Sequence, residues 1–451
     1  THFCRKLNMK KFNVKPPIEF KNNLFGDSQN RGNEWISLGR LAESGPIKNI
    51  NYDISGERVV GIFGKRGSGK SYTLGSFIEG FFIKDNSSEI CKTNHKRAGV
   101  LFDTLNIFWG LDNSINIDDL NPNLVEQIKY IKNWKINPSE LDVTVWIPRG
   151  LKDQNTPSHY KEFSIDLSSL DAHDWGFLFD VDIYLDTMGQ LIYDLWYKVV
   201  LNGWQLDTQN IKPKADYNIN DLIECLQNDK EIENNYTKET KRALMQRFSS
   251  VNKNSLFSGS GTKLNELLRP GALSVLELNN LNDNLRALLT TVYIKKILHQ
   301  RSKAAEIEKQ LKLNSKLTQA QKIDLQQQLD NSIPHSWVFI DEAQVLLPSD
   351  KKLVSNDIIT KYVKEGRNHG LSFCFTTQQP SSIDSKVMSQ LDTLIVHKLT
   401  VQNDIDYIMK NLKSNNPETI KHGLYEYSPN DLIRALDNGE AFISNSESQR
   451  N

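Results

Sequence analysis

The stretch that decides the fold reads Gly64-Lys65-Arg66-Gly67-Ser68-Gly69-Lys70-Ser71. It has the spacing G-x-x-x-x-G-K-[ST] of a loop that surrounds phosphate groups. An apolar run, 58–63, ends directly before it, and a pattern typical of a helix, 72–84, begins directly after it. A buried strand, a glycine-rich loop and a helix in this order predict a nucleotide-binding P-loop. The alternative is an ordinary glycine-rich turn.

The residue types in this loop suit phosphate binding. Gly64, Gly67 and Gly69 permit backbone conformations that direct successive N–H groups at the phosphates. We expect the Lys70 charge to bind the β- and γ-phosphates and the Ser71 hydroxyl to bind Mg²⁺. ATP and Mg²⁺ are therefore the predicted cofactors. The predicted nucleotide-binding residues are Gly64, Lys65, Arg66, Gly67, Ser68, Gly69, Lys70, Ser71 and Tyr72.

Two adjacent acidic residues, Asp341 and Glu342, follow the apolar run 338–340. We expect Asp341 to hold Mg²⁺ through water and Glu342 to polarise the water that attacks the nucleotide. Burying two carboxylates at a strand end is costly without a cation, which favours this interpretation. The alternative is a chance Asp-Glu pair that caps a helix.

Three further polar residues lie at the ends of predicted strands or helices. Gln378 follows the strand 372–377 and is predicted to sense the γ-phosphate or its water; alternatively it is a turn residue before a proline. Arg367 is a candidate for stabilising transition-state charge, in cis or on a neighbouring subunit. The dipole of the helix before it would also favour an arginine there. Asp103 ends the strand 99–103, where it is predicted either to face the ligand or to cap a turn.

The order of the segments predicts the fold class. Strands alternate with helices, which indicates an α/β fold with a mostly parallel sheet flanked by helices. The predicted strands are 58–63, 99–103, 273–278, 337–341, 372–377, 393–397 and 440–444. The predicted helices are 72–84, 284–300, 355–369 and a short one capped by Asn403. The polar segment 301–330 is predicted to form a solvated helical hairpin.

Changes in composition along the chain indicate three parts. They are an N-terminal polar segment, 1–50, an ATPase core, 51–109 and 270–451, and a mostly helical insertion, 110–269. The first part has one plausible strand, 35–38. In the insertion, apolar residues recur at helical spacing, as in 190–200 and 240–249, and a strand-like segment, 143–147, interrupts this pattern.

The composition is that of a globular protein. Of 451 residues, 38% are hydrophobic and 24% charged, and 55 basic residues balance 55 acidic ones. Any DNA contact is therefore expected to be a local basic patch. The four cysteines are scattered, which favours a reducing, cytoplasmic location over a zinc site. We expect no membrane association, because no apolar run approaches the ~20 residues of a membrane helix.

Several segments resemble the HerA branch of the HerA/FtsK ATPases. They are Glu34-Trp35-Ile36-Ser37-Leu38-Gly39-Arg40-Leu41, Ile340-Asp341-Glu342-Ala343, Gly366-Arg367-Asn368-His369-Gly370, Thr377-Gln378-Gln379-Pro380-Ser381, Ser389-Gln390-Leu391-Asp392-Thr393 and Gly439-Glu440-Ala441-Phe442. The resemblance extends over roughly residues 34–109 and 270–445. It implies a RecA-like core and a homo-hexameric ring that binds ATP between subunits and translocates double-stranded DNA. It also implies a separate nuclease or effector partner, in DNA end processing or bacterial defence against phage.

Two features depart from that family. Its N-terminal β-barrel is not evident in residues 1–50. After Asp103 the family often has a glycine and an acidic residue, whereas this chain has Thr104-Leu105-Asn106-Ile107-Phe108-Trp109. The function of this turn therefore stays open.

Two functions from different classes stay open as well. The first is an ATP-hydrolysing ring motor on double-stranded DNA, whose pore would be lined by lysines such as Lys361 and Lys364 or by the basic cluster 92–97. The second is an ATP-controlled oligomeric scaffold that assembles and activates a partner effector, with 110–269 and 301–330 as docking surfaces. A P-loop kinase or metabolic enzyme is a weaker third option, because no small-molecule pocket signature supports it.

Overall fold

The computed structural model describes most of the chain and divides it into two compact units. The described residues are 24–25, 34–41, 49–84, 90–94, 96–115, 118, 125, 128–129, 131–133, 136–257, 260–314, 317–350, 353–412, 419–422 and 425–445. The first unit comprises Thr1–Asn94, Ile115–Ser139 and Phe373–Asn451. The second comprises His95–Ser114 and Glu140–Ser372.

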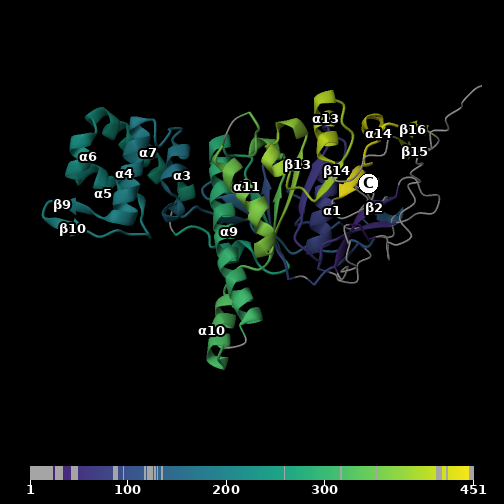
Figure 1. The fold of residues 1–451 in the computed structure, drawn as a ribbon, viewed down its shortest axis with the longest axis horizontal. Helices are drawn as coiled ribbons and strands as arrows, with labels where there is room; N and C mark the ends of the chain where they lie inside the picture. The colour runs from purple at the N-terminus through teal and green to yellow at the C-terminus, as the bar shows by residue number, and fades with distance from the viewer. Residues whose placement is uncertain are drawn as a thin grey trace, which may run out of the picture. The chain divides into compact units, whose positions relative to one another are not determined.

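The first unit carries the strand that leads into the P-loop. Among its described residues, the main-sheet strands follow the order β17 (Phe442–Asn445), β14 (Thr393–Val396), β4 (Val59–Phe63) and β13 (Leu371–Thr377) (Figure 1). The first two residues of β13 belong to the second unit, and the rest, from Phe373 on, belong to the first. β4 is parallel to both neighbours, and β17 is antiparallel to β14. Every residue of β4 is buried, as expected of a strand covered on both faces.

The N-terminal polar segment contributes a small sheet to this unit. Its strands follow the order β1 (Leu24–Phe25), β3 (Asn49–Asp53), β2 (Trp35–Arg40) and β5 (Cys91–Lys92). The predicted strand 35–38 is thus confirmed as part of β2. Helix α1 (Lys70–Phe82) approaches β2 closely, because a Cβ atom on Gly80 would lie 2.7 Å from Ile36 Cγ2. The Tyr52 hydroxyl lies 2.8 Å from Thr393 Oγ1 and so ties the small sheet to β14.

The rest of the first unit consists of short elements after β13. They are η7 (Pro380–Ser382), α12 (Ser385–Met388), α13 (Gln402–Asn411), β15 (Ile420–His422), β16 (Tyr425–Tyr427) and α14 (Pro429–Ala435). The predicted cap of α13 by Asn403 is wrong, since the cap position is Val401 and no side chain caps it. The buried Asp404 decides where this helix begins, because its carboxylate accepts hydrogen bonds from the backbone N–H (3.1 Å) and the hydroxyl (2.7 Å) of Ser381.

The second unit carries the strand that leads into the acidic pair. Its described main-sheet strands follow the order β12 (Ser336–Ile340), β6 (Ala98–Asp103), β11 (Leu273–Glu277), β7 (Val143–Pro148) and β8 (Lys161–Phe163). All are parallel to their neighbours within this set. With the strands of the first unit they make up a mostly parallel sheet of nine described strands, so the predicted α/β fold class is confirmed.

The strand-like segment 143–147, predicted to interrupt a mostly helical insertion, is a strand of the main sheet. It forms β7, which pairs with β11 and is followed in the sheet by β8. The sheet therefore continues into the range assigned to a helical insertion, because Val145, Trp146 and Ile147 bury their side chains in it. The limits of the insertion, 110 and 269, stay a prediction.

A group of helices follows β8, drawn in teal in Figure 1. They are η2 (Leu167–Ser169), α3 (Ala172–Leu178), α4 (Thr187–Tyr197), the π-helical turn η3 (Lys198–Asn202), α5 (Ile219–Asn228), α6 (Lys230–Asn235), α7 (Lys238–Lys253), η4 (Ser255–Phe257) and α8 (Leu264–Leu267), with the hairpin β9 (Trp204–Leu206) and β10 (Gln209–Ile211). The predicted helices 190–200 and 240–249 are confirmed within α4–η3 and α7.

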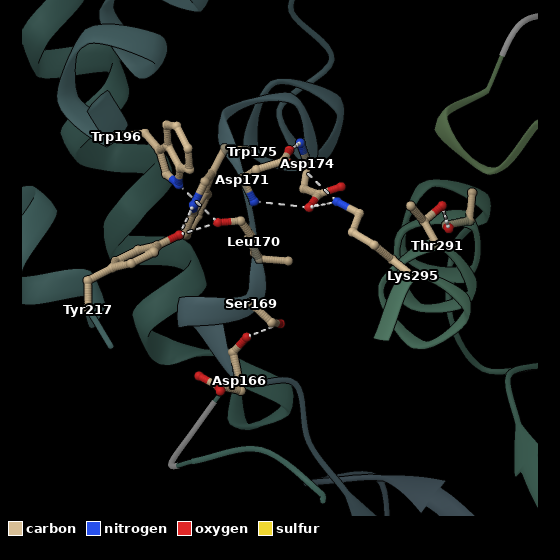
Figure 2. Close-up of polar contacts among 11 residues, drawn as sticks. Asp166, Ser169, Leu170, Asp171, Asp174, Trp175, Trp196, Tyr217, Thr291 and Lys295 are labelled. Carbon is tan, nitrogen blue, oxygen red and sulfur yellow. Dashed lines mark hydrogen bonds and ion pairs between the residues drawn. The ribbon is translucent and has the colours of Figure 1, made fainter. Parts of the chain in front are cut away.

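Three large aromatic side chains in the core of this helical group have their polar atoms hydrogen-bonded within the group (Figure 2). The Trp175 indole N–H donates to the Tyr217 hydroxyl at 2.7 Å, and that hydroxyl donates to the Leu170 carbonyl at 2.8 Å. The Trp196 indole N–H donates to the same carbonyl at 3.2 Å. Large aromatic side chains can therefore be buried here without unpaired donors.

One long helix connects the sheet to a projecting hairpin. α9 (Asp283–Leu313) runs past residue 300, where we predicted its end, and α10 (Gln319–Asp330) returns beside it (Figure 1). The helix continues because Arg301 is buried and donates to the carbonyls of His369 (2.8 Å) and Ile333 (3.1 Å). No described residue of α10 is buried, which confirms the solvated part of the predicted hairpin. Arg301 and Ala304 of α9, also within 301–330, are buried, so the prediction is wrong there. After β12 come η5 (Ala343–Val345), α11 (Val354–Glu365) and η6 (Gly366–His369).

An ion pair joins α9 to the helical group. Figure 2 shows Lys295 pointing at two carboxylates of α3 and its cap, with Nζ 2.7 Å from Asp174 Oδ2 and 2.9 Å from Asp171 Oδ2. The Asp174 side chain is 1% exposed. Burial acts to lower the pKa of Lys295, but the two carboxylates outweigh it and raise that pKa.

We expect Lys295→Met to lower the free energy of unfolding at neutral pH by about 3 kcal/mol, since it leaves the buried Asp174 carboxylate without its cation. Burial already raises the Asp174 pKa, and the variant raises it further. The penalty therefore applies above the unfolded-state pKa and shrinks as the pH falls and Asp174 takes up a proton. Urea unfolding at pH 7 and pH 5 measures this. The exposed Lys303→Met on the same helix is the control, with a change within about 0.5 kcal/mol; equal losses in both variants would contradict the prediction.

Candidate nucleotide site

The loop between β4 and α1 has the backbone conformation that its glycines permit. Gly67 and Gly69 have φ angles of 76° and 115°, in the left-handed region that disfavours residues with a Cβ atom. The helix begins at Lys70, earlier than predicted, and Gly69 is its cap residue. The left-handed glycines turn the chain sharply from the strand end into the helix.

One face of the loop is bound to the protein. Gly64 N–H donates to the Thr377 carbonyl at 3.3 Å, and Lys65 N–H donates to the Lys398 carbonyl at 2.8 Å. The Ser68 hydroxyl donates to the Lys65 carbonyl at 2.7 Å. These bonds anchor the loop to the ends of β13 and β14, beside the end of β4.

The other face presents unused donors. Among the described residues, the backbone N–H groups of Arg66, Gly67, Gly69 and Ser71 have no hydrogen-bond acceptor. No side chain caps the N-terminus of α1, which carries the positive end of the helix dipole. Several N–H donors beside a helix N-terminus match the oxygens of a phosphate chain. This donor set fits a nucleoside triphosphate.

Three predicted ligand side chains sit around these donors. Lys70 is 5% exposed, and its Nζ lies 3.4 Å from the Lys65 carbonyl of the same loop. Ser71 is half-buried in the first turn of α1, where a hydroxyl can reach a cation on the phosphates. Tyr72 is 75% exposed, and its contact with the nucleotide stays a prediction.

The acidic pair follows β12 in the second unit. Asp341 and Glu342 are 0% and 3% exposed. Glu342 has φ 52° and ψ 57°, a left-handed conformation that is uncommon outside glycine and clusters at functional sites. Gln344 Nε2 donates to Glu342 Oε2 at 2.7 Å, and the Thr104 hydroxyl donates to the Asp341 carbonyl at 3.1 Å. The structure thus buries both carboxylates, orients that of Glu342 through Gln344, and fixes the backbone of Asp341 through Thr104.

Asp103 caps its own turn. Its Oδ1 accepts the N–H groups of Leu105 (3.3 Å) and Ile107 (3.1 Å), and its Oδ2 accepts that of Phe108 (2.9 Å). Burial raises the pKa of this carboxyl, while the N–H donors act in the opposite direction. The turn-cap alternative is therefore the one that the geometry supports.

Sequence reasoning missed Glu277 beside Asp103. The two residues are register partners at the ends of β11 and β6. Burial, and secondly the charge of Asp103, raise the pKa of Glu277. Its place at the carboxyl end of a predicted parallel strand was a signal that could have found it.

Gln378 and Arg367 lie in different units. Gln378 is half-buried and follows Thr377, whose carbonyl holds the first glycine of the P-loop. Arg367 is exposed on the short 3-10 turn η6 of the second unit. The proposed roles of Gln378, which directly follows β13, and of Arg367, which is exposed on η6, stay predictions.

His397 is a second residue that sequence reasoning missed. It follows β14, so it lies at the same edge of the sheet as the P-loop. Its Nε2 lies 2.8 Å from Thr73 Oγ1 in α1, and its Nδ1 lies 2.8 Å from the Glu440 carbonyl. Only its position as the last residue of the predicted strand 393–397 could have drawn attention to it.

In the described ranges, no group of three or more His, Cys, Asp and Glu residues is arranged to hold a metal ion. Nor does any helix in those ranges have the length and apolar character to cross a membrane.

Family models and a solved structure are similar to this chain in sequence or in fold. The family model described as "Helicase HerA, central domain" matches residues 36–297, and "Helicase HerA-like C-terminal" matches residues 323–449. Among solved structures, VirB4 of Thermoanaerobacter pseudethanolicus is similar with a TM-score of 0.51 and 13% identity, covering 91% of this chain and 93% of that one. At this identity the likeness concerns the fold alone.

Curated relatives match part of the chain. The DNA double-strand break repair helicase HerA of Sulfurisphaera tokodaii is 26% identical over 176 residues, which are 39% of this chain and 30% of that protein. The protein of the same description from Pyrococcus furiosus is 23% identical over 151 residues, 32% of this chain and 27% of that protein. The match thus spans less than a third of each relative. Because the central-domain model alone matches more than half of the residues, the chain belongs to the HerA helicase family of P-loop ATPases.

Proposed function

We propose that this chain is the ATP-hydrolysing subunit of a HerA-type ring motor that translocates on double-stranded DNA. The observation that carries the proposal is the P-loop between β4 and α1, with its unused N–H donors and the uncapped N-terminus of α1. Membership of the HerA family supports the same assignment. The nucleotide is ATP, bound by residues 64–72.

Each of the proposed site residues has its own role in hydrolysis. Lys70 binds the β- and γ-phosphates through its charge. Ser71 and Asp341 would hold Mg²⁺, which neutralises charge on the phosphate oxygens when it is bound. Glu342 orients the attacking water and accepts its proton. The buried, hydrogen-bonded setting of Glu342 supports this role.

Two further residues complete the proposed reaction. Gln378 orients the water or the γ-phosphate, since it directly follows the strand that holds the loop. Arg367 stabilises the charge that develops on the γ-phosphate. Its exposure on η6 suits a residue that acts on the nucleotide of a neighbouring subunit in a homo-hexamer.

DNA contact in such a ring is electrostatic and local. The chain has no net charge, so a few exposed lysines from each subunit would line the pore. Lys361 and Lys364 are both exposed on α11. The other predicted cluster, 92–97, includes His95, which lies outside the described residues. A separate nuclease or effector is the proposed partner, in DNA end processing or defence against phage.

A second function is favoured by the α9–α10 hairpin. Its far end exposes 79% of Leu313 and 51% of Ile323, and the hairpin projects from its unit (Figure 1). Such a feature suits an ATP-controlled scaffold that assembles and activates a partner effector. In that case ATP would govern oligomer state without DNA translocation.

One experiment separates the two functions. ATP turnover of the purified chain is measured with and without duplex DNA, and its mass is measured by light scattering. The motor predicts an oligomer whose turnover rises with DNA and whose DNA affinity falls steeply with salt. An oligomer with DNA-independent turnover would favour the scaffold, and a monomer that hydrolyses ATP would exclude both.

The lysines of α11 provide a sharper prediction. Replacing Lys361 and Lys364 with alanine should reduce the slope of log affinity against log salt by about 1–2, because each phosphate contact contributes about 0.9. The matched control replaces the exposed Lys303 and Lys309 of α9, which should leave the slope unchanged. Identical slopes in both double variants would place the DNA contact elsewhere.

A further inference from the structure

His397 joins the nucleotide loop to the C-terminal part of the chain. We infer that it is a positioning residue, which couples the P-loop and the first turn of α1 to the C-terminal turn 437–440. The inference rests on the proposed role of residues 64–71 in phosphate binding. It goes beyond that role, because it makes ATP affinity depend on a segment outside residues 64–72.

The hydrogen bonds of His397 define its ring. The backbone N–H of His397 donates to the Phe63 carbonyl at 2.8 Å, which places it beside the last residue of β4. Ring Nδ1 lies 2.8 Å from the Glu440 carbonyl, and a carbonyl can only accept, so Nδ1 carries the proton. In the neutral ring Nε2 then accepts from the Thr73 hydroxyl at 2.8 Å. One side chain thus bridges α1 and the C-terminal turn.

The ring stays neutral at physiological pH. Burial lowers the pKa of His397 to about 4; the bond to the Glu440 carbonyl acts against this shift, and the charge of Lys70 adds to it. A neutral ring keeps one donor and one acceptor in fixed places. The bridge therefore has the same donor and the same acceptor at neutral pH.

The loop packs directly on this bridge. A Cβ atom on Gly64 would lie 2.7 Å from His397 Cβ, closer than real Cβ contacts allow. A Cβ atom on Gly69 would lie 3.4 Å from His397 Cε1 and 3.3 Å from Gly439 Cα. Gly64 therefore leaves no room for a side chain beside His397, and a Cβ atom on Gly69 would be in tight contact with the C-terminal turn.

Two backbone bonds continue the same contact. Lys65 N–H donates to the carbonyl of Lys398, the residue after His397, at 2.8 Å. Gly439 N–H, in the C-terminal turn, donates to the Ser68 carbonyl at 3.0 Å. The turn is itself closed by Asp437 N–H, which donates to Glu440 Oε2 at 2.9 Å.

These contacts hold the loop without using the backbone N–H groups that have no acceptor. The bonds from His397, Lys398 and Gly439 engage Thr73, the Lys65 N–H and the Ser68 carbonyl. The backbone N–H groups of Arg66, Gly67, Gly69 and Ser71 take no part in these contacts. A loop that is held in shape before binding loses less conformational freedom on binding, so it binds more tightly. Loosening the bridge should therefore weaken ATP binding.

The test uses substitutions that remove one bond at a time. His397→Asn keeps a donor near Nδ1 for the Glu440 carbonyl, and His397→Gln keeps an acceptor near Nε2 for Thr73. His397→Ala removes both bonds, and Thr73→Val removes the hydroxyl. Affinity for a fluorescent non-hydrolysable ATP analogue is measured on the purified full chain, with KM, kcat and the melting temperature recorded alongside.

We expect His397→Ala to weaken analogue binding about tenfold, and Thr73→Val, His397→Asn and His397→Gln about threefold, since one net hydrogen bond is worth about 0.5–1.5 kcal/mol. KM should rise by more than kcat falls. Thr73→Val should have no further effect in the His397→Ala background, because both remove the same bond. Fully additive losses, or unchanged affinity in His397→Ala, would overturn the inference.

Two further variants keep the test decisive. If His397→Ala does not fold, Thr73→Ser against Thr73→Val replaces it: the serine hydroxyl should restore affinity, and equal affinity in the two would overturn the inference. Lys70→Ala separates this inference from the proposed function. If Lys70→Ala binds the analogue normally, the P-loop assignment fails; if only the His397 and Thr73 variants are normal, the bridge alone fails.

Discussion

Lys70→Ala lowers the affinity for ATP by roughly a hundredfold, or about 3 kcal/mol, since it removes the charge that the loop presents to two phosphates. Lys70 is 5% exposed, so little water can take over this role. Binding of a non-hydrolysable analogue to the purified chain measures the loss, and circular dichroism shows whether the fold persists.

The matched control for this variant is Lys84→Ala. Lys84 is an exposed lysine just after α1 and lies outside the loop. Its replacement should change the affinity for the analogue less than twofold, by roughly 0.4 kcal/mol. Wild-type affinity in Lys70→Ala would refute the assignment of residues 64–71 to the phosphates.

Glu342→Gln abolishes ATP turnover, by at least about a hundredfold, while ATP binding persists. The glutamine amide has the shape of the carboxylate but cannot accept the proton of the attacking water. Its oxygen can still accept the Gln344 Nε2 hydrogen bond, which is 2.7 Å long in the wild type. The local structure should therefore survive. Phosphate release in a single turnover, measured beside the affinity for ATP, separates chemistry from binding.

The control for Glu342→Gln is Glu365→Gln. Glu365 is exposed at the end of α11, and its charge has no part in the proposed reaction. Turnover in this variant should equal that of the wild type. A fully active Glu342→Gln protein would refute the role of general base, and loss of ATP binding in it would show that Glu342 is needed for the bound state.

Local patterns predicted the elements around the nucleotide. The strand, loop and helix at 58–84 are contiguous, and the glycines, the lysine and the serine each answer a requirement of phosphate binding. Buried apolar runs likewise located β6, β11, β12, β13 and β14 within one or two residues. The fold class followed from their alternation with helices.

Errors arose where distant contacts outweigh local preference. The polar composition after residue 300 suggested a helix end, but Arg301 is buried by carbonyls from Ile333 and His369. Asn403 is a good cap residue, yet the buried Asp404 sets the start of α13 through Ser381. β7 looked isolated because its partner β11 comes much later in the chain.

The sequence by itself determined the P-loop, the acidic pair and the α/β class, because each depends on neighbouring residues whose backbone preferences and burial can be read in order. Only the tertiary structure decided that Asp103 caps its own turn and that His397 bridges Thr73 and Glu440. The physical reason is that a hydrogen bond requires atoms about 3 Å apart. Packing of the sheet and its helices brings such atoms together from positions that sequence spacing does not relate.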